Sequence, residues 1–176
     1  MGKPIVLIGF KASGKTTVGK ALAKRLNTKF LDTDSLLEIR YSEITSNTLS
    51  SRQIYQEHGR DYFMEIETQV VKKVLAMDDT VISFGGGTVE NAYTKGIDLS
   101  GPMYVYLIVG RDILYKRIMK LGLPAFFDKK NPRNSFDKMF DKRSVGFDRL
   151  ANITVENENK PVDEVVNELT EKLNLL

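Results

Sequence analysis

The sequence predicts a single α/β domain in which a parallel sheet is covered by helices on both faces. Four short apolar runs, at residues 5–8, 29–32, 80–84 and 103–109, have the continuous hydrophobic character of strands that are buried on both sides. Helical patterns lie between them, and this alternation is typical of right-handed parallel units. With 176 residues, the chain has the usual size of one domain.

Each predicted strand ends at a recognisable signal. The first strand ends at Gly9, the second ends in Asp32, the third is followed by three glycines and the fourth ends at Gly110. A weaker fifth strand is predicted at residues 151–155. Because parallel strands place their carboxyl ends at one edge of the sheet, these glycines and carboxylates are expected to meet there.

Helices are expected at residues 15–26, 51–77, 111–121, 135–149 and 161–176. The second of these is expected to break near Gly59, and Pro161 occupies a first-turn position in the last one. Residues 122–134 are polar, contain glycine and proline, and separate two helices, so they are predicted to form a lid loop.

The composition excludes several classes of protein. The absence of cysteine excludes disulfides and thiolate chemistry, and the single histidine, His58, excludes a multi-histidine metal centre. The longest apolar stretch is about half of the ~20 residues that a membrane helix needs. A net charge of +3 is too small for a nucleic-acid footprint. We therefore expect a cytoplasmic protein with neither nucleic acid nor a membrane as partner.

Residues 9–16 read Gly-Phe-Lys-Ala-Ser-Gly-Lys-Thr and match the phosphate-binding P-loop pattern. The motif begins where a strand ends and finishes where a helix begins, which is the context that this pattern requires. Glycine at positions 9 and 14 lets backbone N–H groups converge on phosphate oxygens. A glycine turn before a helix with a solvated lysine is the alternative, and the context disfavours it. The sequence thus predicts a three-layer P-loop NTPase fold.

The predicted nucleotide site takes its residues mainly from this loop. Lys15 is expected to bridge the β- and γ-phosphates of ATP, and Thr16 to offer its hydroxyl to Mg²⁺. The full set of expected ATP contacts in the loop is Gly9, Ala12, Ser13, Gly14, Lys15, Thr16 and Thr17.

Further markers follow the P-loop in a fixed order. They are Leu-Asp-Thr-Asp at residues 31–34, then Gly59, Phe63 and Glu67, then Ser-Phe-Gly-Gly-Gly at residues 83–87, then Arg117 and finally Lys142-Arg143. In this order and spacing, residues 5–161 resemble the shikimate kinases, which are related to the nucleoside monophosphate and gluconate kinases. The resemblance implies a monomeric, ATP- and Mg²⁺-dependent enzyme of aromatic amino acid biosynthesis that phosphorylates the 3-hydroxyl of shikimate. It also implies an acceptor-binding region at about 33–62 and a lid at about 119–135 within one domain, 1–176.

The resemblance assigns roles residue by residue. Lys15 and Asp34 would be catalytic, with Asp34 holding the acceptor hydroxyl, and Thr16 and Asp32 would surround the metal. Arg117 would stack on adenine, with Lys160 beside it. The residues implied for the acceptor are Asp34, Phe63, Met64, Glu67, Gly85, Gly86, Gly87 and Arg143.

Plainer structural roles remain open for three of these features. Asp34 is also placed to cap the helix that follows it. The three glycines are also compatible with a flexible loop, and Arg143 with an exposed arginine on an amphipathic helix.

Two positions depart from the family pattern. The family has Phe-Arg where this chain has Phe63-Met64, and Arg-Pro-Leu-Leu in the lid where this chain has Leu-Pro-Ala-Phe at residues 123–126. Arg60, four residues before Met64, is a candidate to reach the same space if the helix continues. The candidates to replace the lid arginine are Lys120, Lys129, Lys130 and Arg133.

These departures leave three functions open. The chain is a shikimate kinase with relocated cations, a sister kinase with another polyol, sugar or nucleoside-like acceptor in a pocket lined by Met64 and Leu123, or a nucleotide-binding module with a decayed acceptor site.

Overall fold

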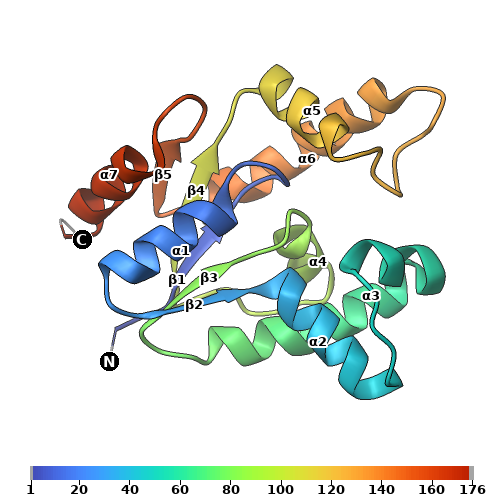
Figure 1. Cartoon of the computed structure of the whole chain (residues 1–176), viewed down its shortest axis with the longest axis horizontal. Helices are drawn as coiled ribbons and strands as arrows, with labels where there is room; N and C mark the ends of the chain where they lie inside the picture. Colours follow the sequence, from blue (N-terminus) through green and yellow to red (C-terminus); the bar gives the residue numbers. More distant parts are fainter. Residues whose placement is uncertain (1, 175–176) are drawn as a thin grey trace.

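A five-stranded parallel sheet forms the centre of the protein, with helices on both faces (Figure 1). The computed structural model describes residues 2–174. The strands are β1 (Ile5–Ile8), β2 (Lys29–Asp32), β3 (Thr80–Ser83), β4 (Met103–Ile108) and β5 (Ile153–Glu156). They lie in the order β2-β3-β1-β4-β5, and every pairing is parallel. The predicted fold class is therefore confirmed, and all five strands point their carboxyl ends to one edge.

Seven helices connect or follow these strands in the described part of the chain. They are α1 (Lys15–Arg25), α2 (Thr33–Thr45), α3 (Ser51–Leu75), α4 (Thr88–Thr94), α5 (Arg111–Lys120), α6 (Pro132–Leu150) and α7 (Val162–Asn174). The short α4, directly after the glycines, was not predicted, and α2 entered the sequence analysis only as the helix that Asp34 was placed to cap. Helix α6 starts three residues earlier than expected because the Asn131 side chain caps it and Pro132 fills its first turn. The last two residues of the predicted C-terminal helix lie outside the described range.

The two faces of the sheet carry separate hydrophobic clusters because alternate strand residues point to opposite sides. In β1, Leu7 packs with α1 and α7 on one face. Its neighbours Val6 and Ile8 pack on the other face, in the cluster that includes residues of α2, α3, α4, α5 and α6. Within residues 2–174, no helix is both long enough and apolar enough to cross a membrane.

Helix α3 is interrupted at Gly59, as predicted. Gly59 has φ 80° and ψ 179°, a backbone conformation that is essentially restricted to glycine. The helix therefore changes direction there, and Arg60 is the first residue after the kink. The position of Arg60 becomes important below.

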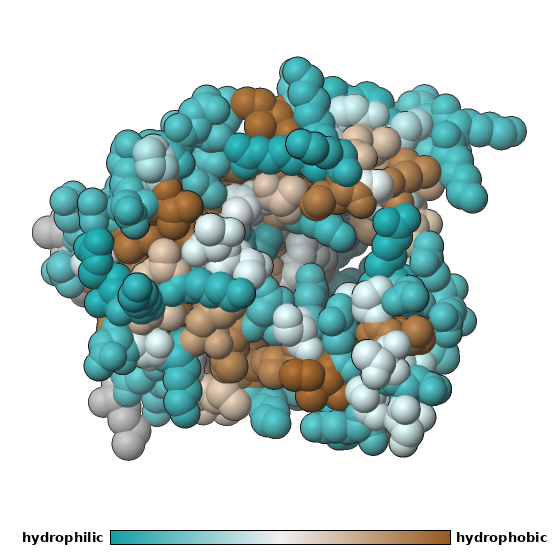
Figure 2. Space-filling model, in the orientation of Figure 1, coloured by the Kyte–Doolittle hydropathy of each residue, from teal (hydrophilic) through white to brown (hydrophobic). Residues whose placement is uncertain are grey.

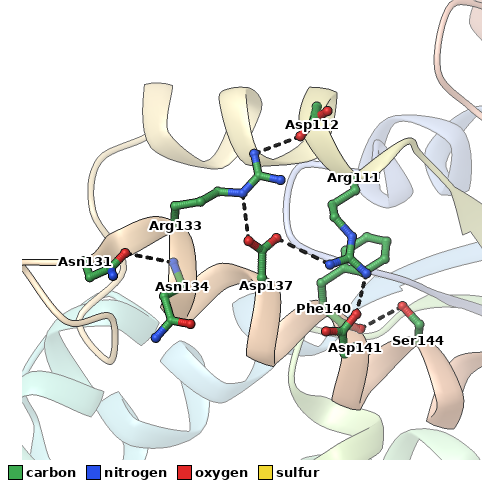
Figure 3. Close-up of polar contacts among 9 residues, drawn as sticks. All are labelled: Arg111, Asp112, Asn131, Arg133, Asn134, Asp137, Phe140, Asp141 and Ser144. Atoms are coloured by element: carbon green, nitrogen blue, oxygen red, sulfur yellow. Dashed lines mark hydrogen bonds and ion pairs between the residues drawn. The ribbon is translucent and has the colours of Figure 1, made fainter.

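A stack of three side chains joins the P-loop to α6. The rings of Phe10 and Phe140 lie almost parallel with their centroids 4.7 Å apart, and the Arg111 guanidinium lies over the Phe140 ring, 4.4 Å from its centroid. Arg111 also pairs with Asp137 and Asp141 of α6 (Figure 3). The start of α5 and the middle of α6 are thus fixed to each other and to the loop after β1.

Candidate active site

A cavity of about 450 Å³ opens at the carboxyl edge of the sheet. Figure 2 shows a hollow between the part of the molecule that carries α5 and α6 and the part that carries α2 and α3. In the described residues, the charged side chains that line this cavity are Lys11, Arg52, Arg60, Lys138, Lys142 and Arg143, together with Asp34, Glu67 and Glu90. We refer to it as the acceptor pocket.

The P-loop borders the pocket and holds Lys15 in a buried position. The Lys15 ammonium donates hydrogen bonds to the carbonyl oxygens of Gly9 at 3.0 Å and Phe10 at 2.7 Å. Gly9 and Gly14 have φ values of 139° and 92°, which glycine adopts without strain. Burial lowers the pKa of Lys15 to about 8, although the charges of Asp34 and Asp32 oppose this shift. The loop therefore holds a desolvated ammonium at the start of α1, where an anion is favoured.

The loop after β5 closes on the P-loop from the nucleotide side. The Asn157 side chain donates to the Ser13 carbonyl oxygen at 2.7 Å, and it lies so close to Gly14 that a Cβ there would be 2.4 Å from its nitrogen. The Arg117 guanidinium donates to the Glu158 carbonyl oxygen at 2.7 Å. Arg117 thus lies beside the P-loop, and its stacking on adenine stays a prediction. Sequence reasoning missed Asn157, since a polar residue after a weak strand gives no signal of its own.

Lys160 and Ser13 were also predicted to contact the nucleotide; Lys160 is engaged in an ion pair, whereas the Ser13 hydroxyl has no partner. The Lys160 ammonium pairs with Glu168 of α7 at 2.6 Å, which directs its charge toward that helix. The buried Ser13 hydroxyl has no hydrogen-bond partner. A buried hydroxyl without a partner costs free energy, and an anion in the loop would supply an acceptor for it.

Thr16 and Asp32 lie together, as the sequence predicted for a metal site. The Thr16 hydroxyl donates to one carboxylate oxygen of Asp32 at 2.8 Å. The other oxygen of Asp32 caps α2 by accepting from the backbone N–H groups of Asp34 and Ser35. Asp32, and not Asp34, is therefore the helix cap, which answers the alternative reading of Asp34.

The donor set of Thr16 and Asp32 fits a magnesium ion. Both groups are hard oxygen ligands, and Mg²⁺ in phosphoryl-transfer sites takes one or two protein groups with substrate phosphates and water. Among residues 2–174, no cluster of three or more acidic or histidine side chains is arranged to hold a metal by itself. A shared site of this kind needs no such cluster.

Asp34 projects into the acceptor pocket beside the glycine turn. A Cβ on Gly85 would lie 2.4 Å from its carboxylate oxygen, so only glycine lets the carboxylate approach the backbone there. Its side chain meets water through the pocket, yet protein surrounds it on the other sides. Burial, followed by the negative charge of Asp32, raises the pKa of Asp34. This carboxylate is a better proton acceptor than an ordinary aspartate.

The glycine turn lines the acceptor pocket and packs against the P-loop. A Cβ on Gly86 would lie 2.8 Å from the backbone nitrogen of Lys11, so the turn touches the P-loop backbone directly. The Gly85 N–H donates to the Thr33 hydroxyl at 2.9 Å, which ties the turn to the start of α2. These contacts show a fixed turn rather than a flexible loop.

Glu67 is buried at the base of the pocket and accepts two hydrogen bonds from α4. Its carboxylate accepts hydrogen bonds from Thr88 Oγ1 at 2.6 Å and from Asn91 Nδ2 at 2.7 Å, and Glu67 is 3% exposed. Burial raises the pKa of Glu67, although these two hydrogen bonds oppose the shift. The contacts fix α4 against α3.

Arg143 reaches the glycine turn from α6. Its Nε donates to a Glu90 carboxylate oxygen at 2.9 Å, and its Nη1 donates to the Gly86 carbonyl oxygen at 3.0 Å. Phe63 lines the same pocket, as expected. Sequence reasoning missed Glu90, because the helix that carries it was not predicted.

Met64 and Leu123 do not line the pocket, contrary to expectation. Met64 is 3% exposed and buried inside the protein, while Leu123 packs partly buried against the core. The lid residues that do face the pocket are Gly122, Pro124, Ala125, Phe126 and Phe127. The physical reason is that apolar side chains at these positions are removed from water into the protein interior.

The four basic residues that were candidates to replace the lid arginine lie outside the pocket lining. Arg133 of α6 pairs with Asp112 of α5 and with Asp137 of its own helix (Figure 3). Lys120, Lys129 and Lys130 are also absent from the pocket wall. Instead, Arg52 of α3 donates to the Leu123 carbonyl oxygen at 2.8 Å, and Lys11 reaches the pocket from the P-loop.

Comparison with known proteins places this arrangement in a family. A family model described as shikimate kinase matches residues 11–174. The chain belongs to the shikimate kinase family. A shikimate kinase of Bacillus cereus (strain G9842) is 30% identical over 173 residues, which cover 98% of this chain and 99% of the relative.

Solved structures agree with this family membership. A shikimate kinase from Aquifex aeolicus has 30% identity and a TM-score of 0.77, over 97% of this chain and 96% of that one. A shikimate kinase from Acinetobacter baumannii, in complex with shikimate, has a TM-score of 0.84 over 98% of this chain and 93% of that one. Its identity is 22%, so this likeness shows the shared fold.

Proposed function

We propose that this protein transfers the γ-phosphate of ATP to the 3-hydroxyl of shikimate. The observation that carries the proposal is the acceptor pocket itself. Its lining includes Asp34, whose pKa is raised, together with arginine and lysine side chains and Lys11 of the P-loop. A hydroxyl to be phosphorylated and an acid group to be held would both find partners there.

The residues act mainly by positioning and by neutralising charge, as phosphoryl transfer requires. The P-loop backbone and Lys15 hold the triphosphate, and the Lys15 ammonium balances the charge on the transferred group. Asp34 orients the acceptor hydroxyl and takes its proton. The acceptor oxygen then forms a bond to phosphorus as the bond from phosphorus to the departing ADP oxygen breaks.

A magnesium ion would be held by Thr16 and Asp32. When bound, it would neutralise charge on the phosphate oxygens and help to align them. Thr16 is exposed at the start of α1, so its hydroxyl is accessible from the nucleotide side. We also propose that the enzyme acts as a monomer in the cytoplasm, which sedimentation and fractionation would test.

The charge of the pocket favours a carboxylate-bearing acceptor over a neutral polyol or sugar. Six cationic side chains and three carboxylates line it in the described residues. A cleft with excess positive charge attracts an anion. The same excess of positive charge argues against a decayed acceptor site. Cations that lie close together repel one another, so a pocket that no longer bound an anion would have no reason to keep them.

An acceptor panel tests this proposal. ADP release would be measured with shikimate, with gluconate, with neutral polyols and with no acceptor. Turnover that depends on shikimate is the expected result. Turnover only with another compound would establish a sister kinase, and nucleotide binding without acceptor-dependent turnover would establish a binding module.

A further inference from the structure

Three cationic side chains from two helices meet at one carboxylate in the wall of the acceptor pocket. Glu90 of α4 accepts from Arg143 Nε at 2.9 Å and from Lys142 Nζ at 2.7 Å, and Arg60 Nη2 lies 3.9 Å away. Glu90 and Arg143 have side-chain exposures of 19% and 17%, so this contact is shielded from bulk water. All four side chains line the acceptor pocket.

The contacts of Arg143 leave part of its guanidinium available. Nε is used by Glu90, and Nη1 is used by the Gly86 carbonyl oxygen. Nη2 lies against Gly87, 3.2 Å from the place where a Cβ would be. Because an arginine has five N–H donors in a rigid fork, the Nη2 group still has donors for a ligand. Glu90 and Gly86 together fix the direction in which those donors point.

Glu90 is itself held firmly in place. Thr88 and Asn91, its neighbours on α4, donate to the buried Glu67 of α3. Helix α4 is thus anchored on α3 and presents Glu90 toward α6. The hydrogen bonds from Lys142 and Arg143 lower the pKa of Glu90, although burial opposes this, so the residue stays a charged partner.

The balance of charge leaves room for a second anion at this wall. One carboxylate faces three cations, and a ligand carboxylate would satisfy the remaining positive charge. Arg60 is the least committed of the three, since it lies at the outer limit of an ion pair and its side chain is 51% exposed. It stands immediately after the Gly59 kink, on the pocket side of α3. Met64, one turn later, is buried and contributes no charge.

We propose that Arg60 and Arg143 bind the carboxylate of the acceptor together, and that Glu90 is the positioning residue that holds the two arginines at the spacing this requires. The inference rests on the proposed function and deepens it. The second guanidinium of the acceptor site is then that of Arg60, the first residue of α3 after the kink at Gly59.

Comparison of shikimate with its methyl ester tests this assignment, because the ester removes the acceptor charge and keeps the reacting hydroxyl. Steady-state kinetics would be measured for the wild type, Arg60→Ala, Arg60→Lys and Glu90→Gln. Arg149→Ala is the matched control, because Arg149 is an exposed arginine on α6 outside the pocket. Thermal melting of each variant would show that it folds.

For Arg60→Ala, we expect the KM for shikimate to rise on the order of tenfold, as for the loss of one hydrogen bond to a charged group, with kcat and the KM for ATP little changed. Arg60→Lys should recover part of this loss, since it keeps the charge but not the fork. Glu90→Gln should also raise the KM for shikimate. The KM for the methyl ester should stay the same in every variant, and Arg149→Ala should behave as wild type.

Two results would overturn the inference. One is an unchanged KM for shikimate in Arg60→Ala, or an equal rise for the ester, which would indicate a general structural effect. The other is a lower KM for shikimate in Glu90→Gln, which would show that the Glu90 carboxylate competes with the carboxylate of shikimate for the arginines. In both cases the wild type still phosphorylates shikimate, so the proposed function stands. If the wild type does not, the proposed function has failed and the inference falls with it.

Discussion

At the scale of single residues, the buried ammonium of Lys15 links nucleotide binding to pH. Its pKa of about 8 in the free protein means that it loses its proton in mildly alkaline solution. A bound triphosphate favours the charged form and raises this pKa. Nucleotide binding above pH 8 should therefore be accompanied by proton uptake.

Calorimetry measures that uptake directly. ATP analogue binding would be followed at pH 8.5–9 in buffers of different ionisation enthalpy, with an expected uptake that approaches one proton. The affinity should fall by up to about tenfold per pH unit above 8. At pH 6.5 the lysine is charged before and after binding, so its contribution should vanish. Equal proton uptake at both pH values would contradict the assignment.

The same shift affects folding stability in the absence of nucleotide. The unfolded chain keeps the Lys15 proton up to its ordinary pKa of 10.5, while the folded protein loses it near 8. The unfolded state then binds more protons between these values, so this group makes the folded protein more stable as the pH rises through that window.

Asp34 provides a second prediction at this scale. Asp34→Asn removes the proton acceptor but preserves the size of the side chain, so acceptor turnover should fall by about 10²-fold or more, while ATP still binds. Asp61→Asn, an exposed change on α3, is the control. The pKa of Asp34 is raised in the free protein. The apparent pKa read from the acid side of the pH profile of kcat/KM should therefore lie above the pKa of an ordinary aspartate. Wild-type turnover in the variant would exclude Asp34 as the base.

Gly86 tests the contact between the glycine turn and the P-loop. In Gly86→Ala, the new methyl group would lie 2.8 Å from the Lys11 backbone nitrogen, and backbone cannot move aside as a flexible side chain does. We expect loss of turnover together with weaker nucleotide binding. Gly146→Ala is the control, because its methyl group would meet only Val89 at 3.8 Å and alanine favours the helix by up to about 1 kcal/mol. Normal nucleotide affinity in Gly86→Ala would show that the turn can shift away.

At the scale of elements, the kink in α3 determines where Arg60 points. Gly59→Ala meets no steric obstacle, but its φ of 80° with ψ near 180° is strained for any other residue. We expect a loss of about 1–3 kcal/mol in the free energy of unfolding, or a straightened helix that moves Arg60 away from the pocket. Chemical denaturation and the KM for shikimate distinguish these results. A variant with unchanged stability and unchanged KM would show that the kink has neither role.

Helix α4 shows why some functional elements escape sequence reasoning. It has seven residues, too few for a helical hydrophobic pattern to stand out, and it is held by the burial of Val89 and Ala92 in the core together with the two hydrogen bonds to Glu67. Without the helix, Glu90 could not be placed near Arg143. The P-loop, by contrast, is encoded locally by glycines and lysine at fixed spacing between a strand and a helix, and could be predicted in detail.

The fate of Met64 and Arg60 illustrates the same difference. The sequence offered Arg60 as a candidate to reach the space near position 64, and in the structure Arg60 lines the pocket while Met64 does not. The sequence could not show that Met64 turns into the protein, since that depends on which face the kink presents. The cap of α2 likewise lies two residues before the position considered from the sequence, because β2 ends at Asp32 and the helix begins at Thr33.

At the scale of the whole molecule, the topology brings the predicted markers together. Strands β1, β2 and β3 are neighbours in the sheet, so the P-loop, the Asp-Thr-Asp segment and the glycine turn emerge side by side at one edge. Their proximity follows from parallel pairing and was predictable. The details of the lid were not, because it contacts two distant parts of the chain, Arg52 and Tyr55 of α3 and Arg143 of α6.

The stack of Phe10 on Phe140 has a consequence for the order in which the two substrates bind. Phe10 belongs to the loop that wraps the donor, and Arg143 lies one turn beyond Phe140 on the same helix. We therefore expect any movement of the P-loop on nucleotide binding to be passed through this contact and along α6 to the Arg143 guanidinium. Shikimate should bind more tightly once an ATP analogue is present, and Phe140→Ala should diminish this cooperativity, as paired titrations would reveal. The contact between these two rings is thus the expected mechanical link between the nucleotide site and the acceptor site.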